Sequence, residues 1–125
     1  MQRTFLLNTM KQFTTPEQTA KLIELGLPRP KSIAKCNVGT GVWGYRPLCE
    51  QIYAYSIGEL IEMLPMAIGA NYLEIFTPVS DRDVWAIAYG WHDYDEFNSL
   101  YYFANEELID ALYEMAVKLK EEGVI

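Results

Sequence analysis

The sequence is poor in the side chains that most often bind metals or attack substrates. Its 125 residues include two cysteines, Cys36 and Cys49, and one histidine, His92. A structural zinc site needs four ligands, and no CxxC pair contributes to one. Two such cysteines favour free thiols in a reducing compartment; the alternative is a disulfide between them. We therefore expect no metal site, no cofactor and a cytoplasmic location.

Long hydrophobic runs are also lacking. The most apolar stretch, residues 60–73, is interrupted by Glu62, Pro65 and Asn71 and falls short of the roughly 20 residues that a membrane helix needs. The apolar run at residues 5–7 is too short for the core of a signal peptide. We therefore expect neither a membrane span nor membrane binding.

What the chain does have is apolar and aromatic residues, with charges that are unevenly divided. The hydrophobic content of 50% and aromatic content of 14% suit one folded domain over residues 1–125 and exclude bulk disorder. Seven basic and two acidic side chains give residues 1–49 a charge of +5, whereas three basic and fifteen acidic ones give residues 50–125 a charge of −12. The net charge of −7 therefore hides two oppositely charged halves.

Helix-start signals predict three helices. Thr15, Pro16 and Gln18 form a capping box with proline at the first position, which predicts a helix over 16–25. Ser56 and Glu59 form a second capping box, which predicts a short helix over 57–64. A broad apolar stripe predicts the longest helix, over 106–122. Asn105 is expected to be its N-cap. Gly123 is expected to end the helix, with Val124 folding back onto it.

Three strands are expected between the second and third helices, at 71–76, 84–91 and 99–103. Their short connections indicate antiparallel hairpins. In the middle strand Trp85, Tyr89 and Trp91 share one face, and the small residues on the other face are expected to receive the C-terminal helix. The large aromatic side chains then either pack under the N-terminal helices, which we favour, or stay partly exposed.

The fold class that follows is α+β, with the order α-α-β-β-β-α. It has one three-stranded antiparallel sheet, a long C-terminal helix and two short N-terminal helices. Residues 27–55 contain three prolines and three glycines and are expected to form a long irregular segment with at most a short strand at 32–38. Loops of this length are often functional.

Three groups of residues carry a resemblance to a known family: 15–18 with 21–27, 55–60 through 64–65, and 108–112 through 122–125. In order and spacing they resemble a family of small uncharacterised proteins from gut-bacterial genomes and their phages or mobile elements. The shared motifs are helix caps and helix faces, so no functional residue is transferred. The resemblance implies a mobile-element setting, a cytoplasmic location and a non-enzymatic role.

Two groups of residues could carry chemistry. His92 beside Asp93 and Asp95 could act as a general base or a metal ligand. Consecutive side chains at a strand end diverge, however, so a solvated hairpin turn is favoured. Cys36 with His92 is the one conceivable nucleophile pair. Neither group predicts an enzyme.

Charge raises the alternative of a nucleic-acid-related protein. Arg29, Lys31, Lys35 and Arg46, near Trp43 and Tyr45, could grip phosphates and stack bases. The acidic second half opposes such binding, and the basic segment is expected to lie across it or to meet it on a neighbouring subunit. The acidic half could instead imitate DNA and inhibit a nucleic-acid enzyme, as a phage-type inhibitor would, although a solvated helix face has the same composition.

The leading prediction is a non-enzymatic protein–protein interaction module with an unknown protein partner. Trp43, Tyr45, Arg46 and Trp91 are the residues expected to contact it, because aromatic and arginine side chains dominate binding energy. The oppositely charged halves make a homo-oligomer a further expectation. Nucleic acid is the less favoured partner.

Overall fold

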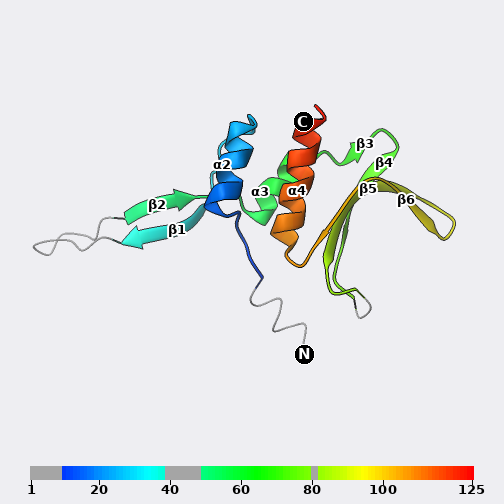
Figure 1. Cartoon of the computed structure of the whole chain (residues 1–125), viewed down its shortest axis with the longest axis horizontal. Coiled ribbons are helices and arrows are strands. Elements are labelled where there is room, and N and C mark those ends of the chain that lie inside the picture. The colour runs from blue at the N-terminus through cyan, green and yellow to red at the C-terminus, as the bar shows by residue number, and fades with distance from the viewer. Residues whose placement is uncertain (1–9, 39–48, 80–81) are drawn as a thin grey trace, which may run out of the picture.

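The computed structural model describes residues 10–38, 49–79 and 82–125, and the side chains at 35–38 and 49–50 lie outside that description. Within it, three helices stand between two antiparallel sheets, one at each end of the molecule's long axis (Figure 1). The elements in chain order are α2 (Pro16–Glu24), β1 (Ile33–Val38), β2 (Cys49–Tyr53), α3 (Ile57–Met63), β3 (Ala67–Ile68), β4 (Asn71–Phe76), β5 (Trp85–Asp93), β6 (Glu96–Asn105) and α4 (Leu108–Glu121).

The α+β class is confirmed, but the prediction of a single three-stranded sheet in the order α-α-β-β-β-α is wrong. Strands β3 to β6 form a four-stranded sheet in sequence order, and β1 with β2 forms a separate two-stranded sheet. Part of the segment at 27–55 is therefore a hairpin, as Figure 1 shows. Its prolines lie outside β1 and β2, which suits strands because proline lacks the ladder donor. Strand β3 has two residues, too few to show periodicity.

The two predicted capping boxes are confirmed. The Thr15 hydroxyl accepts the Gln18 N–H at 3.1 Å, and the Gln18 side chain accepts the Thr15 N–H at 2.9 Å. Ser56 and Glu59 make the same reciprocal pair, each at 3.1 Å. No helix in the described ranges is long and apolar enough to cross a membrane.

The last helix begins later than expected. Its N-cap is Glu107, which has no side-chain capping bond, and not Asn105. The reason is that β6 extends through Asn105, whose Oδ1 accepts the Glu107 N–H at 3.1 Å. The predicted C-terminus is confirmed. Gly123 has a φ of +76°, and the Val124 N–H donates to the Leu119 carbonyl at 2.8 Å, which closes a Schellman motif.

The core forms where α4 packs against α3 and the large-residue face of β5. Ile87 and Tyr89 are fully buried in the same cluster as the apolar stripe of α4. The expectation that α4 would pack on the small-residue face of this strand is therefore wrong. The buried stripe of α4 and these two strand residues belong to one continuous core cluster. The Tyr89 hydroxyl donates to the Pro65 carbonyl at 2.7 Å, which ties β5 to the end of α3.

Burial makes the stability of this core sensitive to alkaline pH. It raises the pKa of Tyr89 from 10.0 to about 12, so the unfolded chain releases the proton first as the pH rises. The contribution of Tyr89 to stability is thus complete below pH 10 and lost as the pH passes about 12. We expect the free energy of unfolding to fall faster in the wild type than in Tyr89→Phe, by up to about 1.4 kcal/mol per pH unit. Urea unfolding of both proteins below and above pH 10 measures this, and parallel curves would contradict it.

Candidate interaction surface

One face of the four-stranded sheet is not covered by a helix of the described chain. Since Ile87 and Tyr89 point into the core, alternation directs Ala86, Ala88 and Gly90 to the opposite face. Both alanines are nevertheless fully buried. We call this surface the aromatic face, and its side chains are Tyr72, Glu74, Phe76, His92, Phe97 and Tyr102.

Phe97 holds the aromatic face together. Its ring meets Phe76 edge-on, with centroids 5.5 Å apart and planes at 78°, and it lies 4.9 Å from the His92 ring. A Cβ on Gly90 would come within 2.5 Å of Phe97 Cζ and 2.3 Å of the Asn98 carbonyl oxygen. Glycine is therefore required where Phe97 crosses β5.

The register between β5 and β6 shifts at this crossing. Tyr89 lies opposite Tyr101, and Gly90 lies opposite Ser99, so Leu100 is an extra residue in β6. An extra residue bends a strand and increases its local twist. The sheet is strongly bent in this region (Figure 1). The bulge and Gly90 together let Phe97 reach Phe76 across the central strand.

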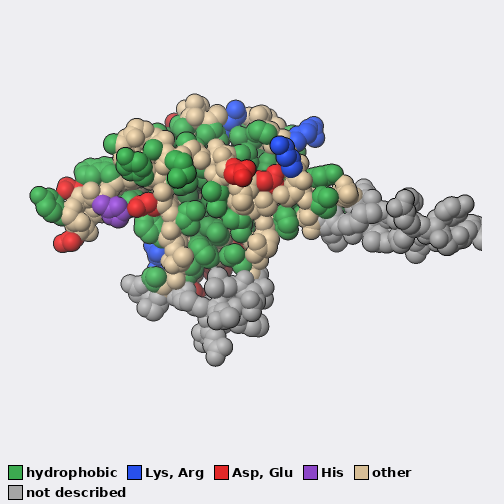
Figure 2. Space-filling model, turned by 180° about the vertical axis from the view of Figure 1, so that it is seen from behind, with side chains coloured by type: hydrophobic (Ala, Val, Ile, Leu, Met, Phe, Trp, Pro, Cys, Tyr) green, Lys and Arg blue, Asp and Glu red, His purple; other side chains and the backbone are tan. Residues whose placement is uncertain are grey.

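An exposed contact between His92 and Glu74 lies beside the aromatic rings. Nε2 of His92 lies 2.9 Å and 3.1 Å from the two carboxylate oxygens of Glu74, and 58% of the His92 side chain is exposed. In Figure 2 the one histidine of the chain lies beside an acidic side chain, and hydrophobic side chains spread over the neighbouring surface. His92 thus contacts Glu74 at the surface of the protein.

A basic group lies at the other end of the aromatic face. The Arg82 guanidinium is 5.6 Å from the centroid of the Phe76 ring, within the range of a cation–π contact. Its Nη2 also donates to the Thr77 carbonyl at 3.0 Å. These two contacts hold Arg82 against the end of β4.

Of the four predicted contact residues, the structure describes one. Trp91 is 45% exposed, but it alternates with His92 and so lies on the sheet face opposite the aromatic face. Trp43, Tyr45 and Arg46 lie outside the described residues. The structure therefore does not bring Trp91 together with the others.

The structure describes some of the residues that were candidates for chemistry with His92. Asp93 ends β5 and Asp95 lies in the turn to β6, and both side chains are exposed, in agreement with a solvated turn. Among the residues that the structure describes, no three His, Cys, Asp or Glu side chains gather as metal ligands would. The side chains of Cys36 and Cys49 lie outside the description.

The sequence interpretation missed Tyr72 and Tyr102 as surface residues. They lie on the two strands that flank β5, near the positions of Ala88 and Gly90, and are 63% and 46% exposed. A signal was present, since the small residues at alternate positions of β5 mark a face that large neighbours must cover. Which face α4 takes could not be read from that pattern.

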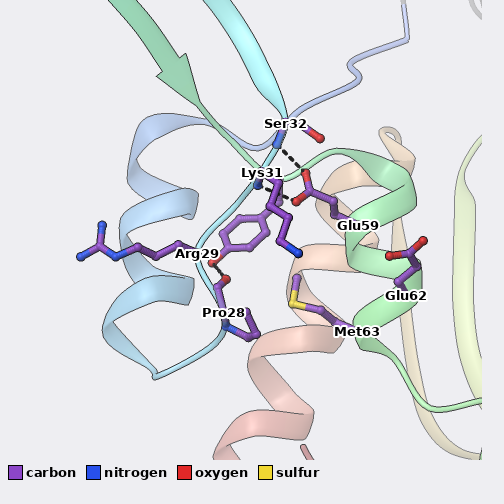
Figure 3. A pocket seen from close by; sticks show the side chains of 8 residues that line it. Pro28, Arg29, Lys31, Ser32, Glu59, Glu62 and Met63 are labelled. Atoms are coloured by element: carbon purple, nitrogen blue, oxygen red, sulfur yellow. Dashed lines mark hydrogen bonds between the residues drawn. The ribbon is translucent and has the colours of Figure 1, made fainter.

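A pocket of about 360 Å³ lies elsewhere, between the 28–32 segment and α3 (Figure 3). The Glu59 carboxylate accepts the backbone N–H groups of Lys31 at 2.8 Å, Ser32 at 3.2 Å and Ser56 at 3.1 Å. The Tyr55 hydroxyl donates to the Pro28 carbonyl at 2.5 Å. These polar atoms fasten the base of the β1–β2 hairpin to α3, which favours a structural role. The lining residues are Pro28, Arg29, Lys31, Ser32, Tyr55, Glu59, Glu62 and Met63.

Comparison of the chain with family models, with curated proteins and with solved structures gives no match. The resemblance to small proteins of gut bacteria and their mobile elements therefore stays a prediction.

The Glu59 carboxylate and the three backbone N–H groups that donate to it, here called the Glu59 clamp, should make the free energy of unfolding sensitive to acid. Burial raises the pKa of Glu59, but hydrogen bonds from Lys31, Ser32 and Ser56 outweigh it and leave the pKa below 4.5. The lowered pKa stabilises the fold above pH 4.5, and this contribution is lost as the pH falls below it. We expect Glu59→Gln to lower the free energy of unfolding at neutral pH by about 1–2 kcal/mol. The matched control is Glu62→Gln, an exposed position of the same helix, and equal effects of both in urea unfolding would refute the clamp.

The close approach at Gly90 gives a second stability prediction. In Gly90→Ala the new Cβ must displace Phe97 or the Asn98 carbonyl, so we expect a loss of about 1–3 kcal/mol in the free energy of unfolding. The control is Gly58→Ala, where the nearest atom, Ser56 Oγ, is 3.9 Å away. Alanine is there expected to be neutral or to stabilise α3. Thermal unfolding followed by circular dichroism separates the two, and a Gly90→Ala protein as stable as the wild type would be inconsistent with this packing.

Proposed function

We propose that the chain is a non-enzymatic protein–protein interaction module that binds its partner through the aromatic face. The observation that carries this proposal is the exposure of Tyr72 and Tyr102, at 63% and 46%, on a sheet face that no described helix covers. Exposed aromatic groups on a monomer often mark an interaction site, and tyrosine is enriched among the residues that dominate binding energy.

The construction of the face supports binding. Tyr72 and Tyr102 lie on β4 and β6, with β5 between them, and their partners on β5 are two residues apart. The packed rings of Phe76 and Phe97 lie on the same face. A partner would therefore meet aromatic groups held by a paired sheet, which limits the entropy that binding costs. The exposed His92–Glu74 pair would lie at the polar rim of such an interface.

Catalysis is less well supported by the surroundings of His92. A general base works within reach of a substrate held in a defined position. The His92 ring is instead exposed and contacts Glu74, away from the pocket beside α3. We take this pair as part of a recognition surface.

The setting of this function follows from the family resemblance and the cysteine content. The cysteine content supports a cytoplasmic location, and the resemblance implies a module of phage or mobile-element type that acts on a protein of its host. The partner is thus expected among host proteins, and a host lysate is the right place to search for it.

A photo-crosslinking experiment tests the proposal. A photoreactive phenylalanine derivative replaces Tyr72 in one tagged protein and Tyr53 in another, because Tyr53 is similarly exposed, at 47%, but lies on β2. We expect one host protein to be crosslinked from position 72 and not from position 53. With that protein purified, Tyr72→Ala should weaken binding at least about tenfold, whereas Tyr53→Ala should not.

Two outcomes would count against the proposal. Equal crosslinking from both positions would mean that the aromatic face is not the contact surface. Recovery of nucleic acid in place of a protein, with retention that falls steeply as salt rises, would favour the nucleic-acid alternative.

A further inference from the structure

Strand β6 forms a long open edge of the four-stranded sheet. It pairs with β5 on one side, and within the described part of the chain no strand pairs with its other side. The edge spans ten residues, from Glu96 to Asn105, whereas at the opposite edge β3 has two and covers only residues 71–72 of β4. In Figure 1, β6 lies at the end of the molecule away from the β1–β2 sheet. Its outward backbone groups are a template for another strand.

This edge lacks most of the features that protect edge strands from pairing. Natural proteins protect such strands with lysine, proline, inward charges or bulges. Residues 97–105 contain no charged residue and no proline, and the bulge at Leu100 is the protective feature that the strand has. Leu100 and Tyr102 are 50% and 46% exposed. The middle of the edge is therefore apolar and open.

Negative charge lies at both ends of the same edge. Asp93, Asp95 and Glu96 are exposed around the β5–β6 turn, and exposed Glu106 follows the other end of the strand. Glu107, the next residue, accepts the backbone N–H of Lys11 at 2.9 Å. An uncharged stretch of nine residues, with an apolar middle, is thus bounded by acidic groups.

We infer that β6 binds an extended segment of a partner protein as an added strand, and that this segment has an apolar middle with lysine or arginine at both ends. Backbone hydrogen bonds supply affinity in this mode of recognition, and the alternate side chains supply selectivity. The basic ends would meet the acidic groups that flank the edge. The inference rests on the proposed function, since it specifies how the partner is bound.

Charge disfavours a second copy of this chain as the occupant. If two β6 strands pair along their whole length in antiparallel register, Glu96 faces Asn105, and Asp95 therefore faces Glu106 of the other copy. Because the pairing is symmetric, this clash of like charges occurs twice, and like charges directly opposite are destabilising. A partner with basic ends removes both clashes.

An added strand would also extend the aromatic face. Its alternate side chains would lie next to Tyr102 on that face and next to Tyr101 on the other, because both strands share the same alternation. Tyr101 is partly buried against the core, whereas Tyr102 is exposed. The strongest side-chain contacts are therefore expected on the aromatic face.

The probe for the test is a fluorescently labelled ten-residue peptide, matched to the length of β6, with two lysines at each end and alternating valine and threonine between them. Two control peptides accompany it. One carries glutamates in place of the lysines, and the other carries N-methyl groups on alternate backbone nitrogens, which prevents strand pairing. Fluorescence anisotropy measures their binding to the full chain at low and physiological salt.

The variant that tests the edge is Leu100→Lys, and its matched control is Ile33→Lys, which introduces the same charge at a position 45% exposed on β1. We expect the lysine-flanked peptide to bind the wild type and Ile33→Lys alike, and Leu100→Lys at least about tenfold more weakly. The glutamate-flanked and N-methylated peptides should bind at least about tenfold more weakly to the wild type. Thermal unfolding of both variants confirms that they are folded.

Four results would overturn the inference: no saturable binding of the lysine-flanked peptide up to about 1 mM, equal binding of the N-methylated peptide, equal binding by Leu100→Lys, or a dimer of the wild type that Leu100→Lys abolishes. The last would identify a second copy as the occupant. If a host protein is still crosslinked from position 72 in Leu100→Lys, the proposed function stands and binding at the β6 edge is not how the partner is held. If the lysine-flanked peptide binds but no host protein is crosslinked from position 72, the edge stands as a strand-binding site and the proposed function fails.

Discussion

The packing of α4 against Ile87 and Tyr89 of β5 is the interaction on which the rest of the described structure depends. The helix contributes seven buried residues, which share one core cluster with Ile87 and Tyr89. The same core includes residues of α2 and α3. Once α4 occupies this face, alternation assigns every other residue of β5 to the opposite one. The position of the helix thus decides which part of the sheet is available to a partner.

The aromatic face follows from this choice. Ala86, Ala88 and Gly90 have little side chain to offer a partner, so the flanking strands must supply the surface. Phe97 does so by crossing Gly90 to reach Phe76, and the bulge at Leu100 permits the bend. Gly90 and the extra residue in β6 therefore allow this sheet to present a packed aromatic layer.

Local signals in the sequence predicted the local structure well. The two capping boxes and the Schellman motif involve residues close in sequence, and all three are confirmed. A short strand at 32–38 was predicted and is present as β1, but its pairing with β2 was missed, because the prolines and glycines of residues 27–55 are typical of a loop and β2 is short. Alternation identified the two faces of β5, but the choice between them depends on packing with α4, which follows a further strand, β6, along the chain.

The candidate surface shows the same division between local and tertiary information. Trp91 was predicted to be a contact residue, and its side chain is exposed, as is common at the end of a strand. Tyr72 and Tyr102 were not singled out, because a tyrosine at alternate positions of a strand fits the core equally well. Their exposure depends on which face the helix covers, and no spacing in the sequence encodes that.

The division of charge now has a structural meaning. Lys11 of the basic half contacts Asp110 at 2.8 Å, and its backbone N–H reaches Glu107, so the two halves do meet within one chain. The acidic groups around β6 have a different arrangement, since Asp95 and Glu106 bracket an uncharged edge. A symmetric partner would bring these carboxylates together, whereas a basic segment would neutralise them. The same charges can thus keep the edge from pairing with itself and admit a strand of opposite charge, which is how an open sheet edge can be both unprotected and selective.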